Sequence, residues 1–167
     1  SSVVNAFATH QGMIFINVGL LAQVENESQL AFVLSHEISY ADSDFIINRL
    51  KAEYGGIILG DLLLGNEVGN LDEMACSLLH LTFAETDVLS ADSYSVDLLC
   101  PFAYDASGIK SILENVDTSD IVVEWLETRG GDFGERIQNI TNHAASCGAE
   151  GQTFIERYQE FKTNLLP

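Results

Sequence analysis

The fold of this chain is decided by the stretch Leu30-Ala31-Phe32-Val33-Leu34-Ser35-His36-Glu37-Ile38-Ser39-Tyr40. It opens with an unbroken apolar run and continues into two ionisable residues, His36 and Glu37, with no turn-forming residue between them. This composition predicts a largely buried helix, with an N-cap at Ser28, that runs from Gln29 towards Arg49. Because buried ionisable side chains are costly unless they are paired or bound, His36 and Glu37 are the first candidates for a functional site.

A small sheet is predicted before this helix, and mostly helices are predicted after it. Residues 3–9 and 13–17 read as two strands that meet at the turn Gln11-Gly12. Further helices are expected over residues 20–24, 54–65, 71–83, 85–100, 107–116, 119–128, 133–143 and 153–166, with breaks at Pro101 and at Gly130-Gly131. The predicted fold class is therefore α+β, mainly α-helical, in a single domain over residues 1–167.

The composition excludes several kinds of partner. Hydrophobic residues make up 47% of the 167 residues, which is enough for a packed core and argues against disorder. The chain has seven basic and 25 acidic residues, and the resulting net charge of -18 repels nucleic acid and anionic membranes. No run reaches the ~18 apolar residues that a membrane-spanning helix requires. A strongly acidic surface is also suited to an extracytoplasmic setting. The localisation we expect is therefore extracytoplasmic, either periplasmic or anchored to a membrane through residues outside this sequence.

The cysteines predict no metal knuckle. Cys76, Cys100 and Cys147 are widely spaced and form no Cys-x-x-Cys pair. Because the count is odd, at least one thiol is left free or available for an intermolecular bond.

The residues His36-Glu37-Ile38-Ser39-Tyr40 match half of the zinc-binding pattern His-Glu-x-x-His. In that pattern two histidines four residues apart lie on one face of a helix and bind zinc, and the glutamate activates the metal-bound water. Here the second histidine is replaced by Tyr40. A His-Glu pair alone is also compatible with a core histidine beside a hydrogen-bonded neighbour.

The surrounding sequence resembles the front of the HtpX-like zinc metallopeptidases, a family that includes the CAAX prenyl proteases and BepA-type periplasmic proteases. The resemblance rests on the order and spacing of Asn5-Ala6-Phe7-Ala8, Gly19-Leu20-Leu21 and the helix of His36. Two later landmarks, Ala91-Asp92 with Ala103-Tyr104-Asp105 and then Glu135-Arg136-Ile137, are similar to the family's pattern as well. The resemblance covers residues 5–140 and implies a zincin-like domain whose small hairpin lies beside the active-site helix.

The resemblance also implies a role for each site residue. His36 takes the place of a zinc ligand, Glu37 that of the general base, and Asp92 that of a carboxylate supporting the metal site from behind its ligands. The strand Ile14-Phe15-Ile16 takes the place of the edge strand that holds an extended substrate. The second and third ligand positions, however, are Tyr40 and Val88, and Gly130-Gly131-Asp132 replaces the family's His-Pro. A phenol with a pKa near ~10 is a poor zinc ligand at neutral pH, and valine has no donor atom.

We therefore predict a metallopeptidase-like domain that has lost zinc binding and catalysis, needs no cofactor, and binds a peptide or protein along its edge strand. The alternative is an active zinc metalloendopeptidase with atypical ligands, in which Asp92, Glu85 or Asp87, and His10 join His36 around the metal. A third hypothesis is an assembly subunit that docks through the apolar runs Ile57-Ile58-Leu59 and Leu62-Leu63-Leu64.

Overall fold

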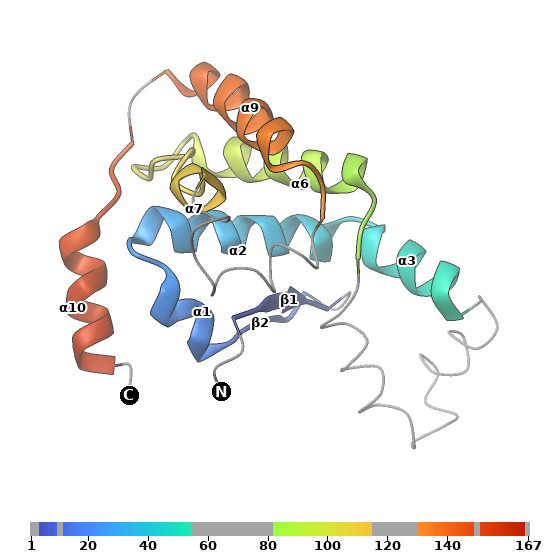
Figure 1. Ribbon diagram of the computed structural model, residues 1–167, viewed down its shortest axis with the longest axis horizontal. Coiled ribbons are helices and arrows are strands. Elements are labelled where there is room, and N and C mark those ends of the chain that lie inside the picture. Colours follow the sequence, from blue (N-terminus) through green and yellow to red (C-terminus); the bar gives the residue numbers. More distant parts are fainter. Residues whose placement is uncertain (1–3, 10–11, 55–81, 115–129, 149–150, 166–167) are drawn as a thin grey trace.

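The computed structural model describes residues 4–9, 12–54, 82–114, 130–148 and 151–165. Helix α2 (Glu27–Asp42) runs through the middle of the molecule, with the hairpin of β1 (Ala6–Ala8) and β2 (Ile14–Ile16) on one side of it. Helix α6 (Glu85–Leu99) packs along the other side, and α9 (Phe133–Ala144) covers α6 (Figure 1). The remaining elements are α1 (Val18–Gln23), α3 (Phe45–Tyr54), α7 (Lys110–Glu114), η3 (Ala145–Cys147) and α10 (Ile155–Leu165).

The expected fold class is confirmed, since the structure is mainly helical with one small antiparallel sheet. The expected strands and the helices over 85–100, 107–116, 133–143 and 153–166 are all present, some with shorter bounds. The helix expected over 119–128 and the apolar runs within 57–64 lie outside the described residues. So do residues 55–65 and 71–81 of two further expected helices, whereas Tyr54 is the last residue of α3 and residues 82–83 are not helical. Among the helices that are described, none is long and apolar enough to cross a membrane.

The hairpin places β1 against the helices and β2 at the periphery. Phe7 pairs with Phe15 across the two strands, and their rings stack with centroids 4.9 Å apart. Ala6 and Ala8 of β1 are buried, because their small side chains let the sheet approach α2 closely. In β2, by contrast, Phe15 is 44% exposed.

Helix α2 begins and ends at positions that differ from the prediction. Its N-cap is Asn26, not Ser28, because the Asn26 side chain accepts a hydrogen bond from the Gln29 amide at 3.0 Å. The Ser28 hydroxyl instead donates to the Gln152 carbonyl near the C-terminus of the chain. The expected single helix to Arg49 is also wrong, since α2 stops at Asp42 and α3 starts afresh at Phe45. The intervening Ser and Asp residues favour such breaks because their side chains compete for backbone hydrogen bonds.

A disulfide links the C-terminal end of α6 to the segment that follows α9. Cys100, directly after α6, is bonded to Cys147 at the end of η3, with the two Cα atoms 5.0 Å apart. Two of the three cysteines are therefore paired, and Cys76 lies outside the described residues. The bond fixes the C-terminal end of α9 against the C-terminal end of α6.

The C-terminal helix α10 docks on the end of α1 through side chains that satisfy backbone carbonyls. The Tyr158 hydroxyl donates to the Leu21 carbonyl at 2.8 Å, and the Lys162 ammonium donates to the Ala22 carbonyl at 2.6 Å. The last carbonyls of a helix have no partner within it, and a cation at that end also complements the helix dipole. These contacts anchor α10 beside the start of α2 (Figure 1).

Candidate functional site

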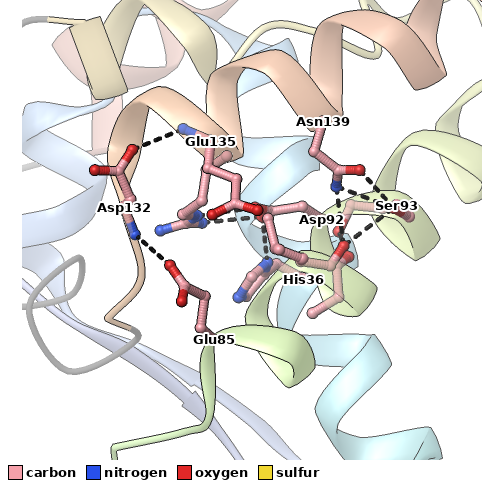
Figure 2. A network of polar contacts seen from close by, with 11 residues as sticks. His36, Glu85, Asp92, Ser93, Asp132, Glu135 and Asn139 are labelled. Carbon is pink, nitrogen blue, oxygen red and sulfur yellow. Dashed lines mark hydrogen bonds and ion pairs between the residues drawn. The ribbon is translucent and has the colours of Figure 1, made fainter.

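The centre of the candidate site is a contact between α2 and α6. His36 of α2 and Asp92 of α6 are both completely buried, and the imidazole Nδ1 lies 3.1 Å from a carboxylate oxygen of Asp92 (Figure 2). Since a carboxylate can only accept, this geometry favours the histidine tautomer with its proton on Nδ1. A carboxylate behind a histidine is the usual arrangement that orients a metal-binding imidazole. The structure therefore brings together the predicted ligand His36 and its predicted support, Asp92.

A third buried residue, Arg136 of α9, completes this centre. Its guanidinium donates from Nε and Nη2 to the two carboxylate oxygens of Asp92, at 2.8 and 2.9 Å. Among the residues that the structure describes, Arg136 is also the largest fully buried side chain. The two parallel hydrogen bonds fix the planes of both groups and tie α9 to α6. Asp92 thus touches α2 and α9 at the same time.

The electrostatics make Asp92 the anion and His36 the neutral member of this centre. Burial alone would raise the pKa of Asp92, but the hydrogen bonds from Arg136 and His36 outweigh it and hold that pKa below its usual range. Burial lowers the pKa of His36, and this effect exceeds the opposing influence of the neighbouring Asp92 carboxylate. At neutral pH the charges of Asp92 and Arg136 therefore cancel, and the imidazole carries none.

The residues at the other two family ligand positions do not fit a zinc ion. Tyr40 lies one turn after His36 on α2, with its ring edge-on to the imidazole at a centroid distance of 5.0 Å. Its ring also packs on Phe83 at 4.2 Å, so it is part of an aromatic cluster. Val88 lies one turn before Asp92 on α6 and is completely buried. A zinc site needs three or four donor side chains, and these three positions supply one good donor, His36.

The replacement ligands considered for an active site do not assemble in the described part of the chain. Glu85 is exposed, and its carboxylate accepts a hydrogen bond from the Asp132 amide at 3.0 Å (Figure 2). It therefore positions the loop before α9. No group of three or more His, Cys, Asp or Glu side chains suited to a metal ion is found among the described residues, Asp87 included. His10 lies outside them.

Glu37, the predicted general base, is completely buried next to His36 on α2. A general base must reach the substrate or a water beside it. Its burial places it within the packed interior of the molecule.

In the described part of the chain, the outer edge of the predicted binding strand β2 has no neighbouring strand. The Thr9 amide donates to the Met13 carbonyl and the Asn17 amide to the Asn5 carbonyl. Hydrogen-bonded pairs alternate along an antiparallel ladder, so the backbone groups of Ile14 and Ile16 point away from β1. Among the described residues they have no strand partner. This is the geometry that accepts an added strand.

Arg136 was predicted only as part of a family landmark, and its place at the centre of the site was not predicted from the sequence. A signal was present, because Phe133, Ile137 and Ile140 mark an apolar face of that helix and Arg136 falls on the same face. A charged residue on an apolar helix face predicts a buried partner of opposite charge.

Comparison with known proteins agrees with this geometry. The sequence model of peptidase family M48 matches residues 1–140 of the chain. No match was found among curated proteins. The match covers the hairpin, the helix of His36, the helix of Asp92 and most of α9. The chain is a metallopeptidase-like domain that belongs to peptidase family M48.

Proposed function

We propose that this domain has kept the metallopeptidase scaffold but lost zinc binding and catalysis, and that it acts by binding a peptide or protein. The observation that carries the proposal is the pair Tyr40 and Val88, which occupy the other two family ligand positions with packed, non-ligating side chains. The burial of Glu37 supports it as well. The contact of Asp92 with His36 favours the competing proposal of an active enzyme, because it orients the imidazole as in a metal site.

Restoring the two ligands is expected to restore zinc binding. We expect the purified protein to hold no zinc after dialysis at neutral pH, even with zinc added beforehand, whereas Tyr40→His/Val88→Glu holds close to one equivalent. The reason is that three donors would then stand around one position, with Asp92 already orienting His36. The measurement is elemental analysis of both proteins.

The matched control adds His36→Ala to the double variant and should abolish its zinc. Near-stoichiometric zinc in the unaltered protein would overturn the proposal and favour an enzyme with atypical ligands. A folded double variant without zinc would show that Tyr40 and Val88 are not what prevents binding. Folding of each variant is checked by its unfolding curve.

Peptide binding is supported by the outer edge of β2, which pairs with no other strand among the described residues. Strand addition uses backbone N–H and C=O groups that have no partner in the sheet, and Ile14 and Ile16 present such groups. The exposed side chains of Met13 and Phe15 next to them offer apolar contact to a bound strand. An extended apolar peptide is the partner that this edge fits.

Removing one edge donor should weaken such a peptide. For a peptide selected from a random library on the full chain, Ile14→Pro is expected to raise the dissociation constant at least about threefold, because proline removes one N–H donor. Ile14→Val keeps the donor and serves as the control. Fluorescence anisotropy of the labelled peptide measures both. Equal affinity for the two variants would place the peptide elsewhere on the molecule.

The extracytoplasmic localisation proposed from the sequence gains support from the disulfide between Cys100 and Cys147. Structural disulfides persist in oxidising compartments and are rare in the reducing cytosol.

A further inference from the structure

A cavity lies at the end of the molecule that the disulfide closes. It has a volume of about 490 Å³ and is formed by the end of α6, residues 102–107, the start of α7, the end of α9 with η3, and residues 151–152. The volume is within the range of small-molecule sites. The cavity is separate from the centre at His36 and Asp92, which does not line it.

Two groups of opposite charge line this cavity without pairing. Lys110 and Asp105 are both half-buried, and within the described part of the chain the Lys110 ammonium has neither an ion pair nor a hydrogen bond. One carboxylate oxygen of Asp105 accepts from the Ser107 amide at 2.9 Å and from its hydroxyl at 2.8 Å. The second carboxylate oxygen accepts no hydrogen bond from any described residue. One donor cation and one acceptor anion are thus available to a ligand.

The walls between these charges are mostly apolar. They include Phe102, which is 60% exposed, the alanines Ala106 and Ala144, and the disulfide itself. The disulfide and the backbone bridge between Tyr104 and Gln152 hold the walls in place. An apolar pocket with a few fixed polar groups is the usual form of a binding site for a small organic molecule.

The charges select among the classes of ligand. A simple anion would meet Lys110 but would also face Asp105 and the field of a chain with a net charge of -18. A simple cation would meet Asp105 but would leave Lys110 beside a like charge. A zwitterion satisfies both groups and, being neutral overall, is not repelled by the net charge. We propose that this cavity binds a free α-amino acid with an apolar side chain.

The test is isothermal titration calorimetry of the full chain with L-phenylalanine as the probe. Saturable binding is expected, and Lys110→Met and Asp105→Asn are each expected to weaken it about 10- to 100-fold, the usual contribution of a charged hydrogen bond. Asp105→Asn keeps the oxygen that the Ser107 groups use, and Lys110→Met keeps the length of the side chain. Lys51→Met on α3, an exposed lysine that does not line the cavity, is the control and should bind normally.

Two modified probes separate a zwitterion from simpler ligands. N-acetyl-L-phenylalanine lacks the ammonium and L-phenylalanine amide lacks the carboxylate, so both are expected to bind at least about tenfold more weakly. Equal binding of either one would overturn the assignment to a zwitterion. Absence of any binding of L-phenylalanine at millimolar concentration, or binding unchanged in Lys110→Met and Asp105→Asn, would overturn the site itself. Unfolding curves of the variants exclude misfolding as the cause.

Discussion

Replacing Arg136 with methionine is expected to lower the free energy of unfolding by about 3–5 kcal/mol, the usual cost of removing one partner of a buried ion pair. The substitution keeps most of the side-chain volume but leaves the Asp92 carboxylate buried without its bidentate partner. It also releases the tie between α9 and α6 close to His36. Urea denaturation followed by circular dichroism measures the change.

A double-mutant cycle separates this ion pair from the packing around it. Asp92→Asn removes the charge with little change of shape and leaves Arg136 as the unpaired group, so it should cost a similar amount. The double variant has no buried charge at these positions, and we expect it to lose clearly less than the sum of the two single losses. Losses that add within about 0.5 kcal/mol would show that the two residues act independently.

Removing the disulfide is the second change with a large expected effect. Cys100 and Cys147 are separated by 47 positions, and a loop of that length corresponds to about 4 kcal/mol of lost stabilisation in the chain-entropy account. Cys100→Ser/Cys147→Ser should therefore unfold at a much lower denaturant concentration than the unaltered protein. The cavity beside the disulfide should open as well, because its walls lose their link.

Reduction provides the control for this second prediction. A dithiol reductant should bring the unaltered protein to the stability of the double variant and should leave the double variant unchanged. A difference below about 1 kcal/mol between the oxidised protein and the variant would show that helix packing alone holds α6 and α9 together. Denaturant titrations with and without the reductant supply the comparison.

The sequence by itself determined the main secondary-structure elements and the positions of the candidate site residues along the chain. The apolar run before His36 predicted a buried helix. The hairpin was predicted from strand-like segments that flank a turn, and the helix of Asp92 from helix-like spacing of its apolar residues. Tyr40 and Val88 could also be identified from the sequence as departures from the family's ligand pattern, because the ligand positions lie at fixed spacings along single helices. Local spacing of this kind does not depend on how the helices later pack.

Only the tertiary structure decided how the parts of the chain meet. The pairing of Asp92 with Arg136, 44 positions apart, depends on α6 and α9 lying side by side. The N-cap of α2 is Asn26 rather than Ser28. The Ser28 hydroxyl donates instead to the carbonyl of Gln152, a residue far along the chain. The bond between Cys100 and Cys147 likewise required the ends of two helices to meet. Such contacts join residues that are distant in sequence. They depend on which helices pack against each other, and the local preferences of each segment do not specify that packing.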